Sequence, residues 1–191
     1  LETTHHIDTV VVDKTGTVTY GKPKLTDVMV AEGIKELDFL SYIGAAEKQS
    51  EHPLAEAIVD GIKGREITLQ QVTSFEAIPG FGVKAMINDQ EVLVGTKKLM
   101  NQNNVQIVAI LNQMEELEAQ GKTAMLASID GKYAGMIAVA DTIKESSIQA
   151  IQRLKDMNIE VMMITGDNQL TAAAIGKQAG IDHVIAEVLP E

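Results

Sequence analysis

The chain has 191 residues, of which 45% are hydrophobic and 23% charged, a composition typical of a folded globular protein. Its formal net charge of −11 excludes a strongly basic nucleic-acid-binding surface, because phosphate contacts need clustered Lys and Arg. The sequence contains no cysteine, which excludes a disulfide framework and any thiolate metal site. No stretch approaches the roughly 20 apolar residues that span a bilayer, so we expect the chain to be soluble by itself.

The first expected element is a strand over residues 7–13, whose β-branched run is typical of a buried parallel strand. A turn rich in threonine and glycine follows it. Two helices are then predicted, over residues 34–48 and 53–63, and Pro53 suits the first position of its helix.

The next part of the chain predicts antiparallel hairpins around a helix. The expected strands come in two pairs, over residues 81–88 and 91–94 and over residues 123–129 and 132–140. The first pair flanks Asp89-Gln90, and the second flanks Asp130-Gly131, a strong signal for a two-residue hairpin turn. A helix predicted over residues 105–120 ends at Gly121, a typical residue just after a helix.

The last part returns to a parallel pattern. It predicts a helix over residues 143–157, a strand over 159–164, an alanine-rich helix closed by Gly180 and a strand over 183–186. Together with the first strand these pieces predict a parallel α/β sheet with functional loops at the carboxyl ends of its strands.

The order of these patterns predicts an α+β domain inserted into a discontinuous host. We expect the inserted domain over residues 22–138 and the host over 1–21 and 139–191. A chain that begins and ends this close to its expected elements is typical of a piece of a larger protein.

The sequence Asp13-Lys14-Thr15-Gly16-Thr17 directly follows the first strand. An aspartate there projects its carboxylate beyond the sheet edge, and the small residues permit a tight turn whose N–H groups face a phosphate. This arrangement suits attack by the carboxylate on a phosphoryl group, which gives an acyl phosphate. In the alternative interpretation, Asp13 only stabilises the turn.

A second turn, Thr165-Gly166-Asp167, ends another expected strand of the parallel sheet. Thr165 can donate a hydrogen bond to the transferred phosphoryl group, and the charge of Asp167 favours Mg²⁺ nearby. Asp13, Lys14, Thr165 and Asp167 are therefore the candidate catalytic residues. Asp141 is expected to cap the helix that follows it, with a place near the crevice as the alternative.

The inserted domain carries residues that suit a nucleotide. The imidazole of His52 offers a flat face for a purine, and glycines at 80 and 82 let a backbone approach a ligand closely. Taken singly, His52 fits an ordinary helix start and the glycines fit a turn or bulge. Residues 80–85 also match G-x-G-x-x-A, but they lead into a strand pair and not into the helix of a dinucleotide-binding unit.

The motif at residues 13–17 resembles the phosphorylation signature of P-type ATPases, whose catalytic core belongs to the haloacid dehalogenase-like superfamily. Ser-Glu-His-Pro-Leu at 50–54 and Gly-Phe-Gly-Val at 80–83 resemble motifs of the heavy-metal-transporting branch. The resemblance extends across essentially the whole chain and is closest to copper-transporting members. It implies an incomplete phosphorylation (P) domain with an inserted nucleotide-binding (N) domain.

The resemblance also implies roles for residues. ATP would phosphorylate Asp13, and this carboxylate with the backbone carbonyl of Thr15 would hold Mg²⁺. The residues implied to hold the nucleotide are Glu47, His52, Gly80, Gly82, Val83 and Gly95. His52 would pack near the adenine. The family often has Gly-Asn where this chain has Gly95-Thr96.

The same family carries a lysine and a Mg²⁺-binding acidic loop that do not occur in residues 1–191, so we expect ATP binding with little or no turnover. The implied partners are the transmembrane and actuator domains of the parent chain and a heavy-metal ion, Cu⁺ first. The segment would face the cytoplasm as part of an integral membrane protein.

Three alternatives stay open at this point. The first is a pump for Zn²⁺, Cd²⁺ or Co²⁺. The second is a soluble phosphatase of the same superfamily, although such enzymes commonly have an acid two residues after the nucleophile, where this chain has Thr15. The third is a phospho-accepting signalling or nucleotide-sensing module without a catalytic cycle.

Overall fold

The computed structural model describes residues 6–189, which fold into two compact units. The parallel unit contains residues 6–22, 118–121 and 141–189, and the antiparallel unit contains residues 23–117 and 122–140. Within residues 6–189 no helix has both the length and the apolar character that crossing a bilayer requires. One parallel and one antiparallel sheet, both with helices, confirm the predicted fold class.

The parallel unit contains three strands and two helices. These elements are β1 (Thr9–Asp13), α5 (Glu145–Asp156), β8 (Glu160–Ile164), α6 (Gln169–Ala179) and β9 (His183–Ile185). The strands are parallel in the order β1-β8-β9. Ile151 of α5 and Ile175 of α6 belong to one buried cluster with Met163 of β8, so both helices pack on the same face of the sheet.

Strand β1 differs from its prediction in one respect. The parallel pairing is confirmed, but the prediction of a buried strand is wrong for alternate residues. Val12 packs in the cluster beneath the helices, whereas Val11 is 53% exposed. Successive side chains of a strand point to opposite faces, and α5 and α6 pack on only one face, so Val11 points away from them.

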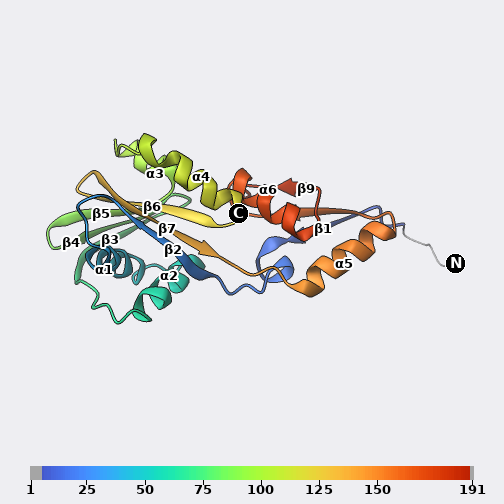
Figure 1. The fold of residues 1–191 in the computed structure, drawn as a ribbon, viewed down its shortest axis with the longest axis horizontal. Helices are drawn as coiled ribbons and strands as arrows, with labels where there is room; N and C mark the ends of the chain where they lie inside the picture. The colour runs from blue at the N-terminus through green and yellow to red at the C-terminus, as the bar shows by residue number, and fades with distance from the viewer. Residues whose placement is uncertain (1–5, 190–191) are drawn as a thin grey trace. The chain divides into compact units, whose positions relative to one another are not determined.

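The antiparallel unit contains six strands. They are β2 (Lys24–Val30), β3 (Val72–Ile78), β4 (Gly82–Ile87), β5 (Gln90–Gly95), β6 (Thr123–Ile129) and β7 (Lys132–Ala140). Their order in the sheet is β2-β7-β6-β5-β4-β3. Helices α1 (Glu36–Glu47) and α2 (Pro53–Lys63) lie on one face, and α3 (Lys97–Gln102) and α4 (Leu111–Ala119) lie on the other (Figure 1).

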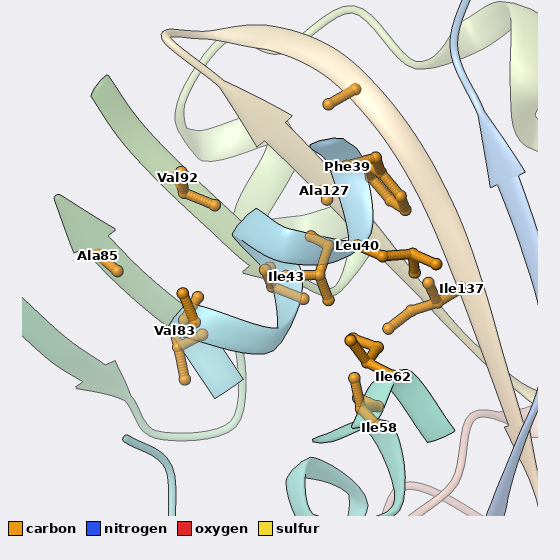
Figure 2. Close-up of a cluster of buried hydrophobic side chains, with 14 of the residues drawn as sticks. Phe39, Leu40, Ile43, Ile58, Ile62, Val83, Ala85, Val92, Ala127 and Ile137 are labelled. Atoms are coloured by element: carbon orange, nitrogen blue, oxygen red, sulfur yellow. The ribbon is translucent and has the colours of Figure 1, made fainter. Parts of the chain in front are cut away.

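Each face of this sheet has its own apolar core. Figure 2 shows Phe39, Leu40 and Ile43 of α1 against the strands, with Ile43 beside Val83 of β4. On the opposite face, residues of α3 and α4 such as Leu99 pack against β5, β6 and β7. Burying one large apolar side chain contributes about 1.5–3 kcal/mol, so the two helical layers hold the sheet between them.

The hairpin turns show one confirmed prediction and one error. Asp130-Gly131 forms the turn between β6 and β7, with φ of +49° and +76°. The turn between β4 and β5 is Asn88-Asp89 and not Asp89-Gln90, because φ is +51° at Asn88 and +59° at Asp89. Asn and Asp tolerate the left-handed conformation that this type of turn needs at both positions, whereas Gln90 already pairs as the first residue of β5.

Several elements were not predicted from the sequence. Strands β2 and β3 and helix α3 were missed. The helix expected over 105–120 is wrong at its start: residues 105–107 are not helical, and the 3₁₀ turn η2 (Val108–Ile110) precedes α4. Strands β2 and β3 each contain a register shift, at Leu25/Asp27 and at Val72/Ser74, and such irregularities weaken the alternation of apolar residues.

Adding a methyl group should reduce the stability of the antiparallel unit by different amounts at Gly82 and at Gly80. At Gly82 (φ +145°) a Cβ would come within 2.1 Å of the Val94 carbonyl oxygen, whereas at Gly80 (φ +77°) it would meet no described atom within 4 Å. We expect Gly82→Ala to destabilise the antiparallel unit by about 3 kcal/mol or more, and Gly80→Ala by about 1–2 kcal/mol through backbone strain. Urea unfolding followed by circular dichroism measures both. Equal losses would contradict the steric argument.

Candidate functional site

Asp13 lies at the carboxyl end of β1 and begins a wide turn, η1 (Lys14–Val18). Thr15 and Gly16 interrupt the turn with non-helical angles, and Gly16 has φ of +76°. One carboxylate oxygen of the exposed Asp13 accepts a hydrogen bond from the Thr15 N–H at 3.3 Å. The loop thus orients the carboxylate through one bond, and the side chain stays accessible from outside.

The parallel register brings the second turn beside the first. Asp13 pairs with Ile164 across β1 and β8, so Thr165 follows at the same edge of the sheet. Thr165 is buried, and its hydroxyl accepts a hydrogen bond from the Asp167 N–H at 3.1 Å. A hydroxyl that accepts in this way still has its own proton to donate to a phosphoryl oxygen.

An ion pair joins the two turns. Lys14 Nζ lies 2.5 Å from Oδ2 of Asp167, and the two side chains are only 11% and 13% exposed. The charge of Asp167, which the sequence suggests as an attraction for Mg²⁺, is therefore balanced by Lys14. Removing either partner would leave a largely buried charge, which typically costs about 3–5 kcal/mol.

The donors at this edge fit a Mg²⁺ ion. Mg²⁺ prefers oxygen ligands and is usually held by one or two carboxylates together with substrate phosphates and water. The accessible carboxylate of Asp13 and the backbone carbonyl of Thr15 lie in the same turn and offer such oxygens. Within residues 6–189 no group of three His, Asp or Glu side chains forms a metal site of its own.

The expected nucleotide residues all lie in the antiparallel unit. Glu47 is the last residue of α1, and His52 precedes α2. The link between them is short, because the Ser50 N–H donates to the Glu47 carbonyl at 2.9 Å and its hydroxyl accepts from the His52 N–H at 3.2 Å. Ile43 of α1 and Val83 of β4 belong to the same buried cluster (Figure 2).

His52 combines both interpretations that the sequence allows. Its Nδ1 accepts a hydrogen bond from the Leu54 N–H at 3.2 Å, so it caps α2, and Pro53 is the first helical residue as predicted. The residue is nevertheless exposed. Capping occupies one ring nitrogen, which fixes the ring and leaves its face and Nε2 accessible.

Glu47 is the most unusual polar residue of this group. It is 3% exposed, and among the described residues its Oε1 has no hydrogen-bond partner. Burial raises the pKa of Glu47 to about 7. A buried oxygen without a donor is rare in folded proteins, and it fits a site where a ligand N–H supplies the missing bond.

The glycine pair Gly82 and Gly95 permits a close approach of two backbones. The two residues face each other in β4 and β5, and a Cβ on Gly95 would come within 2.0 Å of the Phe81 carbonyl oxygen. Val83 points into the core, where it is 5% exposed, so only its backbone is available to a ligand. The hydroxyl of Thr96 accepts from the Leu99 N–H at 3.2 Å and thereby caps α3.

Comparison with known proteins identifies the family. A model of the haloacid dehalogenase-like hydrolases matches residues 7–191. The chain belongs to the haloacid dehalogenase-like hydrolases.

The chain is also similar to individual proteins. A copper-exporting P-type ATPase of Bacillus subtilis is 54% identical over the whole chain, which spans 24% of that relative's length. A crystal structure of a zinc-transporting PIB-type ATPase in the E2.Pi state matches 96% of this chain and 30% of its own, with a TM-score of 0.70 and 33% identity. The N-domain of a copper-transporting P-type ATPase matches 61% of this chain and 99% of its own, with a TM-score of 0.53 and 25% identity.

These similarities confirm the resemblance that the motifs indicate. P-type ATPases generally use ATP and Mg²⁺.

The expectation that Asp141 caps the helix after it is wrong. The residue does not cap α5, because the N-cap position belongs to Lys144. Its carboxylate instead accepts a hydrogen bond from the hydroxyl of Thr19 at 2.8 Å. Thr19 was missed as a candidate, since nothing in a single threonine signals a partner 122 positions away.

The raised pKa of Glu47 predicts a pH-dependent stability. A carboxyl whose pKa rises from 4.5 to about 7 on folding holds more protons in the folded state between these values. Its contribution to stability is therefore full below about pH 4.5 and is lost as the pH rises through about 7. Glu47→Gln removes this titration, so at about pH 8 the variant should be more stable than wild type by up to about 3 kcal/mol.

The difference between the two proteins should shrink as the pH is lowered towards about 5. Urea unfolding curves of wild type and Glu47→Gln at both pH values measure it. A wild-type chain that loses no stability relative to the variant over this interval would contradict the assignment of a raised pKa.

Proposed function

We propose that the chain is the ATP-binding and aspartyl-phosphorylation region of a heavy-metal P-type ATPase, with Cu⁺ as the transported ion. One observation carries the proposal: an accessible Asp13 carboxylate stands at the sheet edge beside the Thr165 turn, with Lys14 and Asp167 joining the two turns. The copper-exporting relative, 54% identical over the whole chain, supports the choice of ion. The whole pump, with its transmembrane and actuator domains and its place in a membrane, is part of this proposal.

The proposed reaction is a phosphoryl transfer. A carboxylate oxygen of Asp13 attacks the γ-phosphorus of ATP, the bond from this phosphorus to the β–γ bridging oxygen breaks, and ADP leaves with the electron pair. The hydroxyl of Thr165 donates to an oxygen of the transferred group. Asp13 and the Thr15 carbonyl would hold Mg²⁺, which would supply positive charge against the phosphate oxygens.

The nucleotide is proposed to bind in the inserted N domain, residues 22–138, while residues 1–21 and 139–191 form the P domain. Among the residues that the structure describes, Oε1 of Glu47 has no donor, and the ring of His52 is exposed, so together they suit the base of ATP. A Cβ at Gly80 would meet no described atom within 4 Å, so a ligand has room to approach there. Gly82 and Gly95 are proposed to shape this part of the site through the close packing of their own backbones, and Val83 through its main chain.

The residue at position 15 favours a pump over a phosphatase. A threonine cannot relay a proton as a carboxylate does, so an aspartyl phosphate formed at Asp13 should persist. Because the lysine and the Mg²⁺-binding acidic loop of the resembled family do not occur in residues 1–191, we also propose that these residues bind ATP with little or no turnover. An acyl phosphate that lasts can be coupled to a conformational change, whereas one that is hydrolysed at once cannot.

An ATP titration followed by NMR tests nucleotide binding. We expect shifts clustered on residues 47–52 and 80–95, and about a tenfold loss of affinity in His52→Ala, because stacking on a base contributes about 1–3 kcal/mol. His183→Ala is the matched control, since His183 is an exposed histidine of the parallel unit. Unchanged affinity in His52→Ala with an intact fold, or equal losses in the two variants, would contradict the assignment.

A further inference from the structure

The carboxylate of Asp141 ties together the segments on both sides of the inserted residues. Its Oδ2 accepts a hydrogen bond from the Thr19 hydroxyl at 2.8 Å. Its Oδ1 accepts from the N–H of Lys22 at 3.2 Å and from the N–H of Thr142 at 2.8 Å. Three donors converge on one side chain, and all of these residues belong to the parallel unit.

Thr19, which donates to Asp141, also contacts the turn that follows Asp13. It is 1% exposed, and its oxygen accepts a hydrogen bond from the Gly16 N–H at 3.3 Å. A hydroxyl has one proton, and the carboxylate of Asp141 is both closer than the Lys14 carbonyl oxygen (3.2 Å) and charged. The Thr19 hydroxyl therefore donates its hydrogen bond to Asp141 and not to the Lys14 carbonyl. A lone pair of the same hydroxyl oxygen then accepts from the Gly16 N–H.

The Gly16 N–H and the Thr15 carbonyl belong to the same peptide unit, so the contact of Thr19 with Gly16 also sets the orientation of that carbonyl. A peptide unit is planar and trans, so its N–H and its C=O point in opposite directions. Fixing the N–H of Gly16 on Thr19 therefore fixes the direction of the Thr15 carbonyl. Gly16 has φ of +76°. Glycine adopts several other backbone conformations almost as easily, so a hydrogen bond is needed to hold this peptide in one orientation.

We propose that Asp141 and Thr19 are positioning residues for the phosphorylation loop: they hold the Gly16 N–H and thereby aim the Thr15 carbonyl. The consequence for phosphoryl transfer rests on the proposed function, in which this carbonyl is a Mg²⁺ ligand. The orientation of the loop itself does not depend on that function.

Backbone contacts between the same two segments support the arrangement. The N–H of Lys144 donates to the Val18 carbonyl at 3.0 Å, and the N–H of Tyr20 donates to the Thr142 carbonyl at 3.1 Å. The hydroxyl of Ser147 donates to the Thr17 carbonyl at 3.1 Å. These bonds hold the two segments side by side when the side chain of Asp141 or Thr19 is changed, so substitutions there should alter the loop and leave the fold intact.

The first test uses residues 1–191 without nucleotide or metal. Amide hydrogen exchange measured by NMR should be about tenfold or more faster at Gly16 in Thr19→Val, which keeps the shape and removes the hydroxyl. Thr19→Ser should restore the wild-type rate, and Asp141→Asn should accelerate exchange at Gly16 and Lys22. The matched control is Thr26→Val, which removes a threonine–aspartate bond, 2.6 Å long, from the antiparallel unit and should leave Gly16 unchanged. An unchanged Gly16 rate in both Thr19→Val and Asp141→Asn would overturn the proposal.

The second test uses a full-length pump that contains this segment. At saturating ATP, Thr19→Val should lower the rate of phosphoenzyme formation about tenfold to a hundredfold and raise the Mg²⁺ concentration needed, with ATP affinity unchanged and Thr19→Ser near wild type. If wild type forms no phosphoenzyme, the proposed function fails. If wild type is phosphorylated and both Thr19→Val and Asp141→Asn match it, the positioning role is overturned and the proposed function stands.

Discussion

The ion pair between Lys14 and Asp167 is the interaction on which the candidate site depends most. Parallel pairing of β1 and β8 puts two turns at one edge of the sheet, and the ion pair then holds the turns together. Because both side chains are largely buried, the pair is costly to break, and a charge left alone there would distort the edge. The accessible carboxylate of Asp13 thus stands beside the hydroxyl of Thr165 on a rigid base.

The antiparallel unit holds polar groups at the edge of an apolar core, where the proposed function assigns them to a ligand. Helix α1 packs its apolar residues against the sheet and ends at Glu47. The Glu47 carboxyl is buried, and in the described part of the chain its Oε1 has no hydrogen-bond partner. The cost of that oxygen is offset by the packing of residues such as Phe39 and Ile43. The hydrogen bond by which His52 caps α2 also fixes the orientation of its ring.

Much of this arrangement could be predicted from the sequence, where local signals are strong. Pro53, the Asp130-Gly131 turn and Gly180 at the end of α6 each carry a conformational preference that tertiary contacts did not override. Strand β2 was missed because a register shift interrupts its pattern, and η2 because a run of apolar residues does not distinguish a 3₁₀ turn from an α-helix. Asp13 and Thr165 could be proposed from the sequence because strand, turn and chemistry coincide, whereas the contact of Asp141 with Thr19 depends on the fold alone.

The central claim is that Asp13 accepts a phosphoryl group, and its most direct test is the site of labelling. A full-length pump containing this segment is incubated with radiolabelled ATP, Mg²⁺ and Cu⁺, and the modified residue is located by peptide mass spectrometry. Asp8→Asn is the control, since Asp8 is an exposed aspartate just before the same strand. We predict an acid-stable, hydroxylamine-sensitive label on Asp13 in wild type and Asp8→Asn, and none in Asp13→Asn; a label that survives Asp13→Asn would contradict the account.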